Sequence, residues 1–86
     1  MPEISRFLGI IVAMYYNDHA PPHFHAKYGE FEIRVNIHSG DILSGKFPRR
    51  ALRLVNEWLN LHRDELIENW RLAENRKPLN TIEPLE

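Results

Sequence analysis

The chain has 86 residues, no cysteine, and a formal net charge of −1 with its histidines neutral. This length suits one domain, residues 1–86, which buries about 60–65% of the surface of its unfolded chain, so a partner would help its stability. Without cysteine there are no disulfides or thiolate metal sites, and the near-neutral charge disfavours a broad electrostatic hold on nucleic acid. The start lacks a signal-peptide pattern, and the longest apolar run is too short to span a bilayer, so we expect a cytoplasmic protein without a membrane segment.

The first predicted strand covers residues 7–16, which are rich in β-branched and aromatic side chains. It is apolar on both faces, and such a strand needs cover on two sides. The face that carries Ile11, Ala13 and Tyr15 has no predicted cover, so we expect it to form a protein–protein interface. Residues 17–22 contain paired prolines and are predicted to form a loop.

A hairpin is predicted next, from strands at residues 23–28 and 31–38. Gly29-Glu30 suits a two-residue type II′ turn with glycine first. The resulting register places apolar pairs on one face and polar pairs on the other: Tyr28–Phe31, Ala26–Ile33 and Phe24–Val35, then Lys27–Glu32, His25–Arg34 and His23–Asn36. A shift by one residue would mix the two faces, which makes this register well determined.

A long helix is predicted over residues 48–75, with Pro48 in its first turn and Pro78 beyond its end. A straight helix of this length would run to roughly 42 Å. A globule of this size is only about 30 Å across, so the helix either bends near residues 62–64 or projects from the domain. The tail, residues 78–86, has an apolar residue at every third position and is predicted to be extended and docked.

A fourth strand, residues 41–45, is predicted after a tight turn at Ser39-Gly40, with Ile42 opposite Ile37. The predicted fold class is therefore α+β. It consists of a small antiparallel sheet of about four strands, of undetermined order, packed by one long and possibly bent C-terminal helix.

The most site-like feature is the histidine-rich segment 17–25, with three histidines within seven positions. On a strand, His23 and His25 project from the same face with their Cα atoms about 6.6–6.8 Å apart. Two such imidazoles can bind one divalent ion, which predicts a metal site. The candidate ligands are Asp18, His19, His23 and His25. Against this, Arg34 is expected opposite His25, and the histidines can instead cap turns and hydrogen-bond the loop.

The same arrangement suits metal-independent cleavage of RNA. His23 and His25 would serve as general acid and base, and Arg34 would stabilise charge developing on a phosphate. We treat these three as candidate catalytic residues, with RNA as the substrate.

A basic cluster lies at the start of the predicted helix: Lys46, Arg49, Arg50 and Arg53. Cations there oppose the helix dipole by about 0.3–1 kcal/mol each, and no acidic residue precedes Glu57 in the helix. The cluster is therefore a candidate anion-binding site for a phosphate or an acidic partner peptide. The alternative is that the side chains are solvated, with Arg53 paired to Glu57.

Four segments carry a family resemblance: residues 1–10, 17–29, 48–52 and 82–85. The second segment contains the motif Asn17-Asp18-His19-x-Pro21-Pro22-His23-Phe24-His25-Ala26-x-Tyr28-Gly29. With these segments the chain resembles a widespread prokaryotic family of small proteins, the domain of unknown function 4160. Genes of that family often look like members of two-gene cassettes similar to toxin–antitoxin modules. The resemblance implies no settled activity, cofactor or catalytic residue.

Three functional hypotheses follow. The first, which the resemblance implies, is a component of a toxin–antitoxin-like module that binds a small partner protein or a second copy of itself. The second is a ribonuclease-type toxin, and the third is a histidine-based metal-binding module. The residues alone leave open whether the protein is an enzyme and which cofactor it uses.

Overall fold

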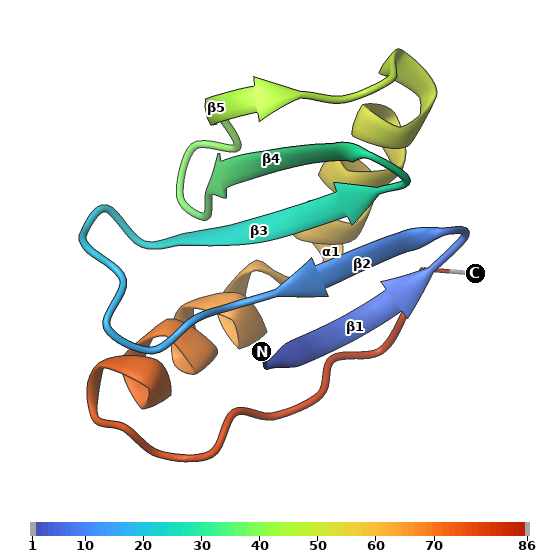
Figure 1. Ribbon diagram of the computed structural model, residues 1–86. Helices are drawn as coiled ribbons and strands as arrows, with labels where there is room; N and C mark the ends of the chain where they lie inside the picture. The colour runs from blue at the N-terminus through green and yellow to red at the C-terminus, as the bar shows by residue number, and fades with distance from the viewer. Residues whose placement is uncertain (1, 86) are drawn as a thin grey trace.

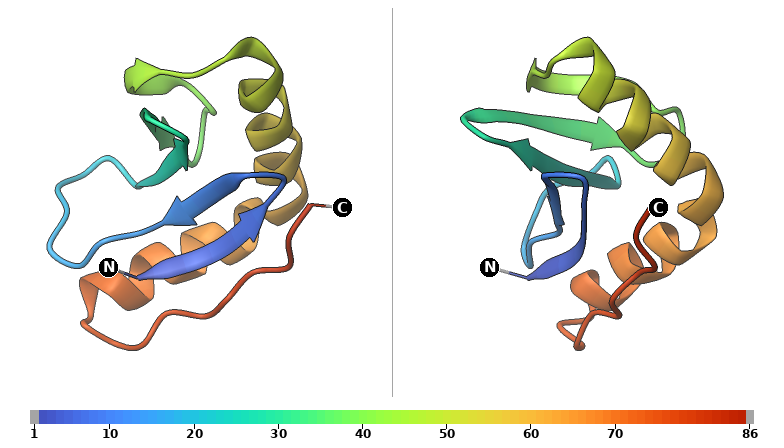
Figure 2. Two further views of the ribbon diagram at one scale, coloured as in Figure 1. Left: turned by 45° about the vertical axis from the view of Figure 1, so that its right-hand side comes forward. Right: turned by 90° about the vertical axis from the view of Figure 1, so that its right-hand side faces the viewer.

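The computed structural model describes residues 2–85; Met1 and Glu86, which the predicted domain and its tail include, lie outside the described residues. Its five strands form one antiparallel sheet in the order β1-β2-β3-β4-β5, and a single long helix, α1, crosses one face of that sheet (Figures 1 and 2). The predicted α+β class is confirmed, with one strand more than expected. Within residues 2–85, no helix combines the length and the apolar character needed to cross a membrane.

The extra strand arises where one strand was predicted over residues 7–16. That prediction is wrong, because the chain forms β1, Glu3–Phe7, then reverses and forms β2, Ile10–Ala13. Leu8 and Gly9 occupy the turn with φ angles of 51° and 84°, the pair of positive values that defines a type I′ turn. Leucine is rare at such a position, so the apolar sequence of residues 7–16 resembles that of one continuous strand.

The central hairpin pairs β3, His23–Tyr28, with β4, Phe31–Asn36, and the six predicted residue pairs are the observed ones. Gly29 begins the turn with φ 58°, as a type II′ turn requires. On the face toward α1, Phe24 and Val35 are fully buried, and Phe24 packs edge-to-face on Trp58. The alternating pattern of the sequence therefore places the hairpin correctly on the core.

The last strand, β5, Ile42–Lys46, forms one edge of the sheet and is exposed along its whole length. Ile42 pairs with Val35, so the predicted pairing with Ile37 is wrong. The turn is wider than expected because the Asn36 side chain accepts hydrogen bonds from two backbone N–H groups inside it.

Helix α1, Arg49–Glu74, bends at His62, whose backbone angles (φ −126°, ψ 23°) are not helical. Of the two predicted alternatives, a bend near residues 62–64 or a projecting helix, the bend is the one observed. Its 26 residues would extend to about 39 Å if straight, whereas the molecule is 34 Å along its longest axis. Just past the bend, Arg63 Nε donates a hydrogen bond of 2.9 Å to the Ile37 carbonyl, which ties the helix to the β4–β5 turn.

The tail, residues 78–85, returns along the outer side of β1 (Figure 1). The Ile82 N–H donates to the Ile4 carbonyl at 2.8 Å, and the Ile82 side chain is buried. Trp58 Nε1 donates to the Glu83 carbonyl at 2.9 Å. The tail is extended and docked, as predicted, and it covers the β1 side of the sheet.

Candidate metal centre

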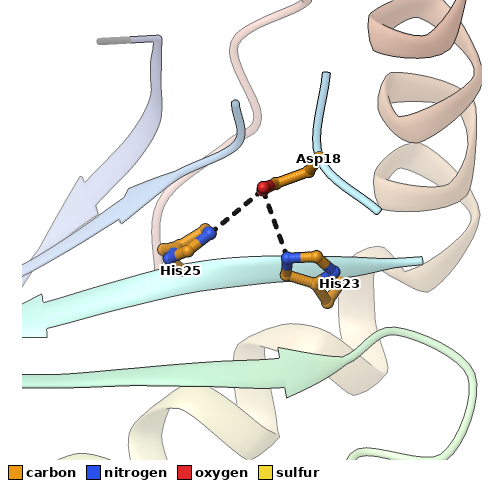
Figure 3. A group of neighbouring side chains, drawn as sticks. All are labelled: Asp18, His23 and His25. Atoms are coloured by element: carbon orange, nitrogen blue, oxygen red, sulfur yellow. Dashed lines mark hydrogen bonds and ion pairs between the residues drawn. The ribbon is translucent and has the colours of Figure 1, made fainter. Parts of the chain in front are cut away.

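Three side chains converge at the end of the sheet where β3 begins. Asp18 comes from the loop between β2 and β3, and His23 and His25 come from β3 itself (Figure 3). Asp18 Oδ2 lies 3.2 Å from His23 Nε2 and 3.1 Å from His25 Nε2. The three ligand atoms lie within 4.8 Å of one another. Ligands about 2.0–2.1 Å from a tetrahedral ion are about 3.4 Å apart, so the carboxylate–imidazole distances are close to those of a metal site.

The tautomer of His23 follows from its backbone contact. Nδ1 lies 2.8 Å from the Pro21 carbonyl oxygen, which can only accept, so Nδ1 carries a proton. In the neutral ring this leaves a lone pair on Nε2. The side chain is 1% exposed, and Nε2 has no hydrogen-bond partner although Asp18 Oδ2 is near. With the ring neutral, two atoms with lone pairs thus face each other, and either a second ring proton or a cation between them would reconcile them.

His25 has the same orientation. Its Nε2 faces Asp18, while its Nδ1 lies 3.4 Å from Glu32 Oε2. The Tyr15 ring packs against it at 4.5 Å in a T-shaped contact. A metal-binding histidine commonly directs its second ring N–H at a carboxylate or a backbone carbonyl, which fixes the tautomer. His23 has the carbonyl as a hydrogen-bond partner, whereas the carboxylate near His25 makes no hydrogen bond with Nδ1. Both rings present Nε2 to one point.

Asp18 is held in place by contacts between its loop and the C-terminal end of α1. Tyr16 donates its hydroxyl to the Lys77 carbonyl at 2.8 Å, and Arg76 Nη2 donates to Asn17 Oδ1 at 2.7 Å. Asn17 has φ 66°, a left-handed conformation that asparagine tolerates better than most residues. These contacts connect residues about 60 positions apart in the chain.

A cleft of about 330 Å³ adjoins the three side chains. Its lining residues are Tyr15, Asn17, Asp18, Trp70, Ala73 and Glu74. Because Asp18 belongs both to the cluster and to this lining, an ion held by the cluster would lie at the edge of the cleft. Three protein ligands leave at least one coordination position open, as in catalytic rather than structural zinc sites.

Two of the predicted site residues lie apart from this cluster. His19 is exposed on the loop and is not among the three converging groups. Arg34 pairs with His25 in the β3–β4 register, but it is exposed and its Nε donates to Ser44 Oγ at 2.9 Å. The guanidinium therefore does not oppose an ion on His25, which removes the objection that the sequence raised.

The sequence also placed both imidazoles on a solvent-facing side of the sheet, and this is wrong. His23 is buried with its ring 5.2 Å from that of Trp70 of α1, and His25 is only 13% exposed. The loop before β3 and the C-terminal half of α1 cover them. Glu32 and Trp70 were missed as parts of the site. Glu32 lies diagonally across from His25 in the predicted register, and that relation could have identified it.

The face predicted to form a protein–protein interface is less exposed than expected. Ala13 is 1% exposed, and Ile11 and Tyr15 are half-buried, so these three residues do not form an open apolar face.

The basic cluster, by contrast, is free in the structure. Its members Lys46, Arg49, Arg50 and Arg53 are all exposed. No ion pair joins any of them to an acidic residue within the part of the chain described, so the alternative of an Arg53–Glu57 pair is not observed.

A five-stranded antiparallel sheet crossed by one bent helix, with two histidines and one carboxylate converging at its end, defines a small α+β domain with a candidate metal centre. The family described as "Domain of unknown function (DUF4160)" matches residues 9–71, and the chain belongs to this family. The matched range contains the whole centre. No curated protein and no solved structure matched the chain.

Proposed function

We propose that this protein binds one divalent transition-metal ion through Asp18, His23 and His25. The observation that carries the proposal is the shared orientation of the two imidazoles. Both direct Nε2 at Asp18 Oδ2, and in both Nδ1 faces an acceptor, which is hydrogen-bonded at His23 and 3.4 Å away without a hydrogen bond at His25. One cation at the meeting point would satisfy the carboxylate and both lone pairs together.

A cluster held by hydrogen bonds alone accounts for His25, whose Nε2 is hydrogen-bonded to Asp18 Oδ2 at 3.1 Å, but accounts less well for His23. His23 Nε2 would have to donate to Asp18, and His23 would then carry protons on both nitrogens while 1% exposed. The separation of 3.2 Å also lacks the direction of a hydrogen bond, since Nε2 has no such partner. A metal ion needs neither a second ring proton nor that direction, so it is the simpler solution.

The donor set limits the kind of ion. Imidazole and carboxylate ligands suit zinc, iron, copper and nickel, and the chain offers no thiolate for softer ions. Two histidines with one carboxylate, and an open position beside a cleft, are typical of centres that activate a bound water or ligand. We therefore propose an ion accessible from the cleft rather than a closed structural site.

The test is a calorimetric titration with Zn²⁺ and with Co²⁺, on protein made without a histidine tag and stripped with a chelator. We expect one ion per chain. Asp18→Asn and His25→Ala should lower the affinity by more than the roughly 10–100-fold that loss of an outer-shell partner costs. His19→Ala is the matched control and should bind as the unsubstituted protein does, because His19 lies outside the cluster. Circular dichroism reports whether each variant is folded. Absence of binding, or equal affinity in Asp18→Asn, would refute the proposal.

The ribonuclease hypothesis has less support. An acid, a base and a guanidinium must reach one phosphodiester. His23 is buried, and Arg34 is turned to Ser44.

We also propose that the protein works with a small partner protein, as the toxin–antitoxin-like cassettes of similar proteins imply. The observation that favours a partner is a set of large apolar side chains left exposed at one end of the sheet. These are Leu8, Tyr28 and Phe31, exposed by 58%, 38% and 41%.

A further inference from the structure

A second hollow lies at the end of the molecule opposite the metal centre. It has a volume of about 370 Å³. The β1–β2 turn, the end of β3 and the first turns of α1 surround it, and these elements meet at the right of Figure 1. Its lining residues are Leu8, Tyr28, Pro48, Arg50, Ala51 and Leu54. We call it the Leu8 groove.

Leu8 is an unusual residue for its position. It occupies the first place of a type I′ turn with φ 51°, where asparagine, aspartate and glycine are favoured. A left-handed conformation is unfavourable for such a residue, because its Cβ comes too close to the following carbonyl oxygen. The side chain then remains 58% exposed, so its burial inside this chain does not offset that cost. Contact with another molecule would give the leucine a role that the isolated fold does not.

The rim of the groove is basic. Arg50 lines it, and Arg53 follows one turn later beside Leu54. The first turn of α1 has no acidic residue, and its N-cap Pro48 makes no side-chain capping hydrogen bond. The first N–H groups of the helix therefore add to the positive potential. The fitting occupant is negatively charged and also carries a large apolar group.

We infer that the Leu8 groove binds a short acidic segment of a partner protein. A leucine or aromatic side chain of that segment would lie between Leu8, Tyr28 and Leu54, and flanking Asp or Glu residues would contact Arg50 and Arg53. RNA fits less well, because four of the six lining residues are apolar and the chain has a net charge of −1. This inference rests on the proposed partner protein and is independent of the metal centre.

The test is a peptide-display selection on the immobilised, unsubstituted protein, with Arg50→Glu as the counter-selected bait. We expect the enriched peptides to place at least two acidic residues beside a large apolar one. By fluorescence polarisation, Arg50→Glu and Leu8→Asn should each weaken a selected peptide at least tenfold. Lys77→Glu, an equal charge reversal at the far end of α1, should have no effect. Leu8→Asn suits the turn and should keep or raise the melting temperature, so its loss of binding cannot come from unfolding.

Three results would overturn the inference: no enriched motif, peptides that bind Arg50→Glu as tightly, or displacement of the peptide by a single-stranded RNA oligomer at lower concentration. A concentration-dependent dimer that Arg50→Glu abolishes would assign the groove to a second copy instead. Co-purification with the product of the neighbouring gene distinguishes the groove inference from the proposal of a partner protein. If it co-purifies equally with Leu8→Asn and Arg50→Glu, the groove inference fails and the partner proposal stands.

Discussion

A neutral imidazole has one N–H donor and one lone pair, and at His23 the Pro21 carbonyl decides which nitrogen has which. The carbonyl accepts a hydrogen bond from Nδ1–H, so the lone pair of the neutral ring is on Nε2, which faces Asp18. At His25, Glu32 Oε2 lies 3.4 Å from Nδ1 without forming a hydrogen bond. The candidate centre thus depends on two outer groups that would not touch the ion.

Glu32 gives a test of this arrangement. We expect Glu32→Gln to weaken Zn²⁺ binding about tenfold, at the low end of outer-shell effects, because this side chain is 47% exposed. The measurement is competition against a chromogenic zinc chelator. With Co²⁺ in place of zinc, the visible spectrum should also shift, which a general loss of stability would not cause.

Arg34→Ala is the matched control for that variant, because Arg34 neighbours Glu32 on β4 but bonds to Ser44. It should leave the affinity unchanged. If Arg34→Ala weakens binding and Glu32→Gln does not, the assignment of the His25 nitrogens is wrong.

At the scale of elements, the β4–β5 pair depends on one close approach. Gly45 lies opposite Ile33 with φ 91°, and a Cβ there would clash with the Glu32 carbonyl oxygen of β4. Only glycine fits this position. The same stretch of β4 also places the Glu32 side chain near His25. A change in the pairing of β4 with β5 would therefore also affect the candidate centre.

We expect Gly45→Ala to lower the free energy of unfolding by more than the roughly 1–2 kcal/mol of a left-handed alanine, because β5 must also move away from β4. Urea denaturation measures the loss. Gly29→Ala is the control, since Gly29 has φ 58° and nothing within 4 Å of an added Cβ. Equal losses in the two variants would show that the contact with β4 is unimportant.

The bend in α1 is the other decisive feature at this scale. It allows the N-terminal half to cover Phe24 through Trp58 while the C-terminal half brings Trp70 to His23. A straight helix could not do both within a molecule 34 Å long. The hydrogen bond from Arg63 to Ile37 lies next to the bend and holds the two halves at their angle.

For the whole molecule, the candidate centre joins parts that the chain connects only distantly. The Asp18 loop is bound to the end of α1 through Tyr16 and Arg76, and β3 supplies the histidines. An ion on all three ligands would cross-link the loop to the sheet. Ligands that bind only the folded state stabilise it by mass action.

We therefore expect Zn²⁺ at 100 times its dissociation constant to add about 2.7 kcal/mol to the unfolding free energy. For a domain of this size, that raises the melting temperature by roughly 10 °C or more. Differential scanning calorimetry with and without a chelator measures the shift, and Asp18→Asn should lack it. A shift of the same size in Asp18→Asn would place the ion elsewhere.

Several features follow from the sequence alone, because they arise from local backbone geometry. The twofold alternation of strands set the β3–β4 register, and with it the fact that His23 and His25 lie on one side of β3. The predicted length of the helix exceeded the expected diameter of the domain, which left a bend or a projecting end, and the bend at His62 is observed. These rules act over a few residues and need no knowledge of distant contacts.

The tertiary structure alone decided the remaining features. Leu8 gives no local signal of a turn, so only the pairing of β1 with β2 shows that the first strand is two. Asp18 reaches the histidines because Tyr16 and Arg76 fix its loop to the end of α1, about 60 residues away. Burial of His23 depends on Trp70, which lies beside His23 because the helix bends. Such features depend on long-range packing, and local sequence periodicity carries no record of it.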